Sequence, residues 1–168
     1  MDLTIRKAGF EDTKAYMELL LEVKKAMSEP AWFYVDPEEL IRQMMEDGTM
    51  ELWVAEDGNR LAGAFSVVHP GVSEDNLGRE LDFSEEQLLR VVHMDSAAVH
   101  PDYRGLKLQK RLMEAAEEYL QQENRILLCT IHPDNRFSLQ NVLNQGYRIE
   151  KKLEKYDSVR YILRKDLE

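Results

Sequence analysis

The sequence predicts an α/β (α+β) fold in which helices flank one mixed central β-sheet. Apolar residues recur at strand spacing in some segments and at helical spacing in others, which is typical of this class. A strand–helix–strand pattern over 91–131 predicts one right-handed parallel unit, and the remaining strands are expected to be antiparallel. No linker, repeat or low-complexity tract divides the 168 residues, so we expect a single domain over residues 1–168.

The first part of the chain predicts a strand, two helices and a hairpin. LTIRKA at 3–8 alternates as a strand does, and an apolar stripe from Tyr16 to Met27 predicts an amphipathic helix. In D-P-E-E at 36–39, we expect Asp36 to cap a second helix, with proline at its first position and Gly48 at its end. ELWVAED and LAGAFSVV then predict two strands joined by a tight turn.

The second part predicts an excursion followed by alternating strands and helices. Residues 70–87 are polar and acidic, and we expect an irregular segment with a short helix there. A strand over 91–99 and a helix over 106–123 precede ILLCTI at 126–131, whose continuous apolar run is typical of a strand buried on both faces. A helix at about 136–145 and a final strand pair, YRIEKKLEKY and VRYILRKDL, complete the expected order.

Composition and charge narrow the classes of function. The 43% hydrophobic and 32% charged residues are typical of a soluble globular protein, and no apolar run reaches the ~20 residues that cross a bilayer. The net charge of −10 argues against a nucleic-acid partner, whose phosphates it would repel. One cysteine, Cys129, excludes an internal disulfide, and the four histidines show no zinc spacing, so we expect no metal site. Without a signal-peptide pattern in the first residues, the expected compartment is the cytoplasm.

The segment HPDYRGLKLQKRLM at 100–113 places positive charges at the start of an expected helix. Lys107, Lys110 and Arg111 come first and glutamates follow, which is the reverse of what an isolated helix favours. Each reversed charge costs only ~0.3–1 kcal/mol, so an exposed basic turn is one explanation. The other is that unpaired N–H groups at the helix start bind an anion, with Gly105 allowing the backbone to approach it closely.

With the preceding valine included, the segment VHPDYRGLKLQKRLM resembles the cofactor motif of the GCN5-related N-acetyltransferase (GNAT) superfamily. A second segment, HPDNRFSLQNVLNQGY, is similar to the N-x-x-(A/S)…G-F/Y motif found later in that family. Both motifs occur in the family's order, and the expected elements over 3–166 follow those of its acyl-CoA N-acyltransferase fold. The resemblance implies that the chain binds acetyl-CoA, with its pyrophosphate against backbone amides of the loop.

The resemblance also implies particular contacts with the cofactor. Backbone groups of Ala97 and Val99, with Ala98 between them, would hydrogen-bond the pantetheine arm. Asn135 would reach the pantetheine, and Ser138 would lie near the same end of the cofactor. The residues implied to surround the pyrophosphate, through backbone N–H groups or positive charge, are Arg104, Gly105, Leu106, Lys107, Leu108, Gln109 and Lys110.

The chain departs from the family's pattern at three positions. Lys107 and Gln109 stand where the family has glycine or another small residue, which narrows the allowed backbone angles and adds bulk near the phosphates. If the loop runs directly into right-handed helix, glycine is not required and Lys107 adds charge. Val142 stands at the position of the family's frequent general-acid tyrosine. A thiol of pKa ~8.5 is a tolerable leaving group without that acid.

Two candidates for a general base lie on the 91–99 strand. By alternation, His93 and Asp95 share a face with Ala97 and Val99. Some family members place a carboxylate base near the position of His93. His93 has the better-suited unperturbed pKa, and the alternative for both residues is an ordinary paired polar side chain on a half-exposed strand.

The acceptor pocket is expected around an aromatic cluster. Trp32, Phe33 and Tyr34 lie in the loop that commonly lines this pocket in the family. The acidic 70–87 excursion either covers the pocket, which would suit an amine, or is a solvated charge run.

These observations predict an N-acetyltransferase that moves an acetyl group from acetyl-CoA to a primary amine of a small molecule or peptide by direct attack. One alternative is a CoA-binding regulatory module without useful turnover. Another is that the 106–123 helix docks a protein partner and binds no nucleotide. A homodimer is also open, because exposed strands are expected near the carboxyl end.

Overall fold

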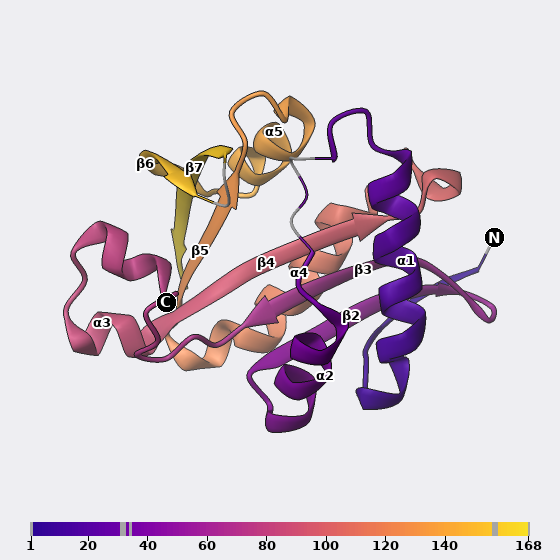
Figure 1. Cartoon of the computed structure of the whole chain (residues 1–168), viewed down its shortest axis with the longest axis horizontal. Coiled ribbons are helices and arrows are strands. Elements are labelled where there is room, and N and C mark those ends of the chain that lie inside the picture. The colour runs from indigo at the N-terminus through magenta and orange to yellow at the C-terminus, as the bar shows by residue number, and fades with distance from the viewer. Residues whose placement is uncertain (1, 31–32, 34, 156–157, 168) are drawn as a thin grey trace. The chain divides into compact units, whose positions relative to one another are not determined.

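The computed structural model describes residues 2–30, 33, 35–155 and 158–167. Helices lie beside a seven-stranded mixed sheet, so the predicted fold class is confirmed (Figure 1). The strands in sheet order are β1 (Leu3–Lys7), β2 (Met50–Asp57), β3 (Arg60–Val68), β4 (Val91–Val99), β5 (Ile126–Ile131), β7 (Ser158–Asp166) and β6 (Arg148–Lys155).

The chain forms two compact units. The first unit comprises Met1–Val67 and Ser96–Glu118, and the second comprises Val68–Asp95 and Tyr119–Glu168. Strand β4 therefore contributes its first half to the second unit and its last residues to the first. That residues 1–168 act as one N-acetyltransferase domain stays a prediction.

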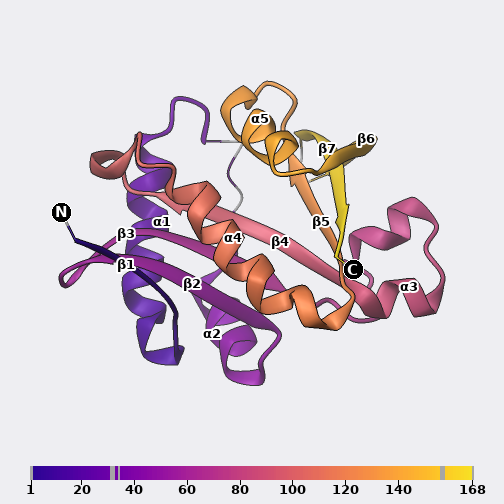
Figure 2. The same ribbon diagram turned by 180° about the vertical axis from the view of Figure 1, so that it is seen from behind.

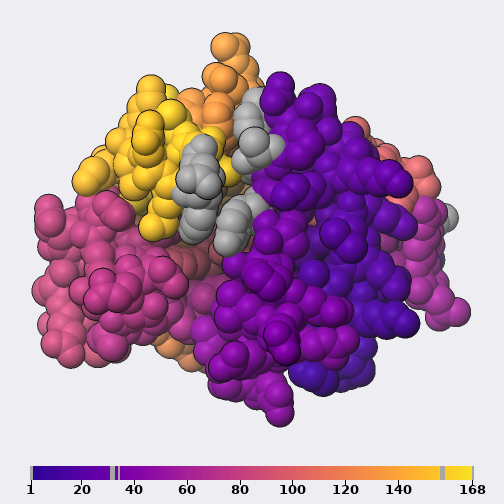
Figure 3. All heavy atoms as spheres, viewed as in Figure 1, coloured from indigo at the N-terminus to yellow at the C-terminus, as the bar shows by residue number. Residues whose placement is uncertain are grey.

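In the first unit, helices cover both faces of the strands. Its helical elements are the 3-10 turn η1 (Phe10–Asp12), α1 (Thr13–Ala26), α2 (Glu38–Asp47), the 3-10 turn η4 (Pro101–Tyr103) and α4 (Leu108–Leu120). Helices α1 and α2 lie on one face and α4 lies on the other (Figures 1 and 2). The side chains of α1 and α2 form the outer surface of this unit on the side shown in Figure 3.

The apolar stripes predicted from the sequence attach these helices to the sheet. Tyr16 and Leu20 of α1 are buried, as is Leu112 of α4. Gly63 of β3 allows α4 an especially close approach: a Cβ there would lie 3.1 Å from the Ala98 carbonyl oxygen and 3.3 Å from Leu112 Cδ1. The start of α4 is therefore fixed closely against β3.

The second unit is built around the parallel pair of β4 and β5. Val91–His93 pair with Ile126–Leu128, which confirms the predicted parallel strands, and β5 pairs on its other edge with antiparallel β7. β7 pairs in turn with β6, as the predicted final strand pair. The other elements of this unit are η3 (Leu77–Leu81), α3 (Glu85–Arg90), η5 (Gln121–Glu123) and α5 (Arg136–Asn144).

The acidic excursion, residues 70–87, is anchored in the second unit. Asn76 is 1% exposed, and its side chain accepts from the Gly78 N–H at 2.8 Å and donates to the Gly71 and Leu88 carbonyls at 2.7 and 3.0 Å. Leu77 enters the core beside Val91, Ile126, Leu128 and Ile162. The hydrogen bonds of the buried Asn76 amide and the packing of Leu77 thus hold the excursion in place.

Two helix starts differ from the prediction. Helix α2 begins at Glu38, and its N-cap is Pro37 rather than Asp36, because Pro37 is extended with ψ 144°. Helix α4 begins at Leu108 instead of 106, because Lys107 has φ +58°, outside the right-handed helical region. Helix α4 ends at Leu120, where the chain tightens into η5.

Candidate cofactor site

The loop Arg104–Lys107, between η4 and α4, contains two residues in the left-handed region. Gly105 has φ +84° and Lys107 has φ +58°. The loop therefore does not run directly into right-handed helix, and Lys107 adopts a conformation that favours glycine. For a lysine this costs about 1–2 kcal/mol. Gln109, the other non-glycine departure, lies inside α4 and carries no such strain.

The start of α4 leaves backbone donors available. The Arg111 N–H donates to the Lys107 carbonyl at 3.0 Å, which is the first hydrogen bond of the helix. By helix geometry, the N–H groups of Leu108, Gln109 and Lys110 precede that bond and have no partner within the helix. A lysine side chain has no acceptor atom, so Lys107 cannot cap these donors. Donors of this kind suit an anion, and the anion site at this helix start stays a prediction.

The last residues of β4 present backbone groups on the edge away from β3. The His100 N–H donates to the Ala62 carbonyl of β3 at 2.8 Å, and the Ala98 carbonyl also lies toward β3, beside Gly63. Backbone groups of successive residues in a strand point to opposite edges. Those of Ala97 and Val99 therefore point to the other edge, as contacts with an extended ligand arm require.

A histidine side chain fixes the turn that follows each strand of the parallel pair. His100 Nδ1 accepts from the Asp102 N–H at 3.1 Å, and His132 Nδ1 accepts from the Asp134 N–H at 3.0 Å. In the neutral ring the proton of His100 is then on Nε2, which lies 2.8 Å from Glu22 Oε2 of α1. The sequence repeats His-Pro-Asp at 100–102 and 132–134, and this repeat is the signal for the two turns that the histidines fix.

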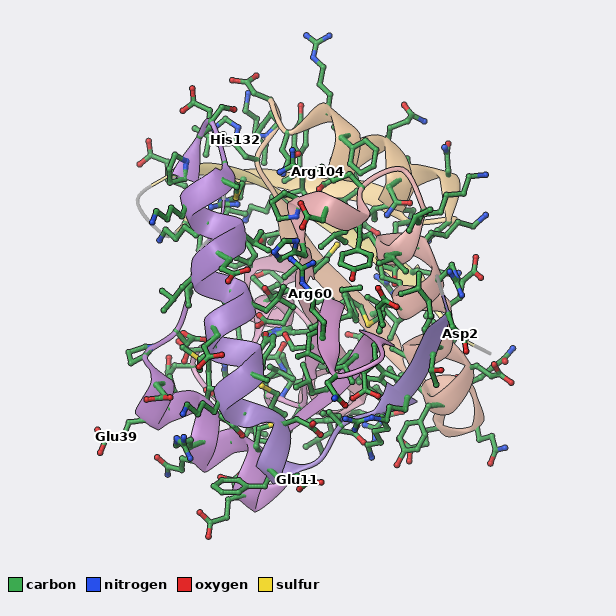
Figure 4. The ribbon with its side chains drawn as sticks, turned by 90° about the vertical axis from the view of Figure 1, so that its right-hand side faces the viewer. Asp2, Glu11, Glu39, Arg60, Arg104 and His132 are labelled. Carbon is green, nitrogen blue, oxygen red and sulfur yellow. The ribbon has the colours of Figure 1, made fainter. Side chains whose placement is uncertain are left out.

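Arg60, at the start of β3, completes the support of the first turn (Figure 4). Its guanidinium lies 2.9 Å from Asp102 Oδ2 and 5.4 Å from the ring centroid of Tyr103. The Tyr103 hydroxyl donates to Asp57 Oδ2 at 2.6 Å, and this hydrogen bond raises the pKa of Tyr103 above its usual value. The β2–β3 hairpin thereby holds the turn that precedes the loop.

Two predicted cofactor residues lie at the start of α5 in the second unit. Asn135 is the N-cap of α5, and its Oδ1 accepts from the Ser138 N–H at 3.5 Å. Both side chains are half-buried. Val142, at the position of the family's general-acid tyrosine, is 2% exposed. Its side chain faces the interior, so a tyrosine in the same orientation would be buried.

The structure places the two base candidates in different environments. His93 is 8% exposed, and its Nε2 accepts from the Leu77 N–H at 3.0 Å. Burial, followed by the positive charge of Lys155, lowers the pKa of His93 to about 4. Asp95, two residues further along β4, is exposed. Of the two base candidates, only the Asp95 carboxylate is at the surface.

The acceptor-pocket prediction falls largely outside the described part of the chain. Phe33 is half-buried, and its N–H donates to the Pro30 carbonyl at 3.1 Å. Trp32 and Tyr34 lie outside the described residues. Over the ranges that are described, no group of three or more His, Cys, Asp or Glu side chains is arranged to hold a metal ion. Within the same ranges, every helix is too short or too polar to cross a membrane.

The fold is that of an α/β protein with a mixed sheet, and comparison with known proteins gives its family. The model of the Acetyltransferase (GNAT) family matches residues 15–147, so the chain belongs to that family. No curated protein sequence matches the chain.

Solved structures of acetyltransferases share the fold over the whole chain. A GNAT-family acetyltransferase from Streptococcus pneumoniae is 16% identical, with TM-score 0.74 and coverage of 99% of this chain and 100% of the other. YncA, a putative acetyltransferase from Salmonella typhimurium with its cofactor acetyl-CoA, is 15% identical, with TM-score 0.74 and coverage of 100% and 95%. PaiA N-acetyltransferase from Thermoplasma acidophilum, in complex with coenzyme A, is 17% identical, with TM-score 0.65 and coverage of 99% and 99%.

Proposed function

We propose that this protein is an acetyl-CoA-dependent N-acetyltransferase that acetylates a primary amine of a small molecule or peptide. The observation that carries the proposal is the loop Arg104–Lys107, with Gly105 and Lys107 in the left-handed region, leading into the first N–H groups of α4, which have no partner within the helix. Two similar structures support it, because their proteins bind acetyl-CoA or coenzyme A. The predicted cytoplasmic location remains part of the proposal.

The residues of the first unit fit a pyrophosphate ester. The N–H groups from Gly105 to Lys110 are proposed to surround the pyrophosphate, and the exposed side chains of Arg104 and Lys107 add positive charge. Ala97 and Val99, whose backbone groups point away from β3, are proposed to hydrogen-bond the pantetheine arm. In the second unit, Asn135 and Ser138 are retained as proposed cofactor residues.

Bound acetyl-CoA would supply an acetyl thioester: its carbonyl carbon would bond to the amine nitrogen as the carbon–sulfur bond breaks, and the departing CoA thiolate would take up the proton lost from that nitrogen. The Val99 N–H is proposed to polarise the thioester carbonyl. The attacking amine must be neutral, so its ammonium proton passes to a base or to water. We assign this role to Asp95 in preference to His93, since Asp95 is exposed, whereas His93 is buried and its Nε2 already accepts from the Leu77 N–H.

The charge of the protein suits an amine acceptor. A net charge of −10 attracts cations by long-range steering, and primary amines are cationic in solution near neutral pH. Trp32, Phe33 and Tyr34 remain the proposed acceptor-binding residues on the basis of the family resemblance. The identity of the amine is a matter for a substrate screen.

Calorimetric titration with acetyl-CoA tests the cofactor site. Gly105→Pro replaces φ +84° with about −65° and removes one donor, so we expect at least a tenfold weaker affinity than wild type. Gly48→Pro is the matched control: Gly48 has φ +82° at the end of α2, and, like Gly105, nothing lies within 4 Å of a Cβ there. We expect Gly48→Pro to lower the melting temperature and leave affinity within twofold.

A screen of polyamines, amino acids, aminoglycosides and peptide amino termini tests the enzymatic step. Acetylation of at least one class with release of free CoA thiol would support the proposal. Binding of acetyl-CoA without turnover on any class would favour the alternative of a regulatory CoA-binding module, which the strained Lys107 and the buried Val142 also favour. Absence of binding by wild type at millimolar acetyl-CoA would contradict both.

A further inference from the structure

The pyrophosphate loop receives little support from packing at its own residues. Arg104, Gly105, Leu106 and Lys107 are all exposed, and no atom lies within 4 Å of a Cβ built at Gly105. Lys107 is also strained in the left-handed region. A loop of this kind keeps its shape only if the segments on either side are held firmly. On one side, the close packing of α4 on Gly63 serves this purpose.

On the other side, His100 connects the turn before the loop to α1. The His100 side chain is 12% exposed, and its two nitrogens make different contacts: Nδ1 accepts from the Asp102 N–H, and Nε2 lies 2.8 Å from Glu22 Oε2. The ring also contacts Tyr103 edge to face, with 6.0 Å between centroids. His100 therefore links α1, the end of β4 and η4.

Arg60 connects the same turn to the β2–β3 hairpin. Its guanidinium donates to Asp102 Oδ2 at 2.9 Å and lies over the Tyr103 ring. Tyr103 is 4% exposed and donates to Asp57 at the end of β2. The turn is thus held by α1 on one side and by the hairpin on the other.

We infer that Glu22, His100, Asp102 and Arg60 form a positioning network that keeps the pyrophosphate loop in its binding conformation, an inference that rests on the proposed function. None of the four is assigned a contact with the cofactor. The guanidinium of Arg60 is engaged by Asp102, and the carboxylates of Glu22 and Asp102 would repel a phosphate, so the network acts through the shape of the loop. Its effect is specific to the pyrophosphate part of the cofactor.

The test compares two acetyl donors in calorimetric titrations with the full chain. Acetyl-CoA carries the pyrophosphate, whereas S-acetylpantetheine lacks it. We expect Glu22→Gln and Arg60→Met each to weaken acetyl-CoA binding by about two- to fivefold, the range that a hydrogen bond (Glu22–His100) or an exposed ion pair (Arg60–Asp102) contributes. S-Acetylpantetheine binding is expected to stay within the error of the wild-type value.

Matched variants separate positioning from general effects. Glu18→Gln removes the same charge one turn earlier on α1, where the side chain is exposed, and should leave both affinities unchanged. His100→Asn keeps an acceptor near the Nδ1 position for the Asp102 N–H but does not reach Glu22, so it should behave like Glu22→Gln. Arg60→Lys keeps the charge without the planar guanidinium and should recover only part of the loss.

The outcomes are distinguishable. If wild type fails to bind acetyl-CoA, the proposed function itself is wrong. If wild type binds and Glu22→Gln, His100→Asn and Arg60→Met bind acetyl-CoA equally well, the network does not position the loop. If these variants weaken both donors equally, or Glu18→Gln has the same effect, the changes reflect stability or net charge, and the inference is also overturned.

Discussion

The two His-Pro-Asp turns of this protein begin alike and end differently. In each, the histidine Nδ1 accepts from the aspartate N–H two residues later, at 3.1 Å for His100 and 3.0 Å for His132. After the second turn, Asn135 caps α5 directly through its own side chain. After the first turn, the chain passes through Gly105 and Lys107 in the left-handed region before α4 begins.

The same His-Pro-Asp turn therefore precedes two different kinds of helix start. A polar cap such as Asn135 satisfies helix donors from within and stabilises the helix. Lys107 offers no acceptor, so its side chain cannot cap the donors of α4, and the loop bears conformational strain. A helix start that its N-cap side chain does not satisfy is less stable and suits an external anion.

The largest effect is expected when the first turn is made to resemble the second. Lys107→Asp places a carboxylate where it accepts from the N–H groups of α4 and opposes a bound phosphate. We expect acetyl-CoA affinity to fall about 30- to 100-fold, from lost charge, new repulsion and occupied donors. Calorimetry measures this loss, and thermal unfolding should show stability equal to or above that of wild type.

Lys14→Asp is the control for net charge, because Lys14 is an exposed lysine on α1. It makes the same charge change outside the loop and should lower affinity by less than about twofold, through long-range repulsion alone. Equal losses for the two variants would show that α4 binds no anion.

The second prediction concerns His93, the buried histidine on the strand that leads into the first turn. Its folded pKa of about 4 lies below the ordinary 6.5, so between these values the unfolded chain binds more protons. Stability due to neutral His93 is therefore full above pH 6.5 and is lost as pH falls toward 4. Between pH 7 and 5 we expect a loss of about 2 kcal/mol in the free energy of unfolding, measured by urea denaturation.

His93→Gln is the matched variant, because its Oε1 can accept from the Leu77 N–H and does not titrate. It should remove the pH dependence between 7 and 5 that belongs to His93. The lowered carboxyl pKa values of Asp12 and Asp166, from ordinary values of 3.8, affect stability only at lower pH. An unchanged slope would mean that His93 is not the group responsible. Lost turnover with normal acetyl-CoA binding would restore His93 as the base.

Periodicity was sufficient to predict the framework that carries the site. The strands at 91–99 and 126–131 have the predicted bounds, because long apolar runs report burial directly. The start of α4 was misplaced, because nothing in the residue type of a lysine indicates a left-handed backbone. Such a conformation is set by the segments on either side, among them Gly63 and His100.

Side-chain networks were harder to predict than the loop itself. Arg60, Tyr103 and Glu22 come from separate parts of the chain, and only the folded sheet brings them to the turn. The burial of His93 also followed from tertiary packing of the 70–87 excursion, whereas its unperturbed pKa suggested a base. The local sequence therefore indicated the chemistry of the proposed anion site, but it did not predict the side chains that hold the turn before it.

A third and smaller effect is expected at the second turn. Asn135→Ala removes the side-chain cap of α5 and should lower the free energy of unfolding by about 1 kcal/mol or less, since the bond to the Ser138 N–H is long at 3.5 Å. Asn135→Asp keeps an acceptor and should restore stability. If Asn135→Ala leaves stability unchanged while weakening acetyl-CoA binding, the residue serves the cofactor rather than the helix.

The smallest expected effect is a difference in stability between two variants of Lys107, which distinguishes backbone strain from side-chain charge. Lys107→Gly relieves about 1–2 kcal/mol of left-handed strain but adds about 0.4–1 kcal/mol of unfolded-chain entropy, so stability should rise by at most about 1.6 kcal/mol. Lys107→Ala loses the same charge and keeps the strain. Both should therefore weaken acetyl-CoA binding similarly and reduce its salt dependence, while only the glycine variant gains stability in urea denaturation. Equal stability of the two would show that Lys107 is not held in the left-handed region.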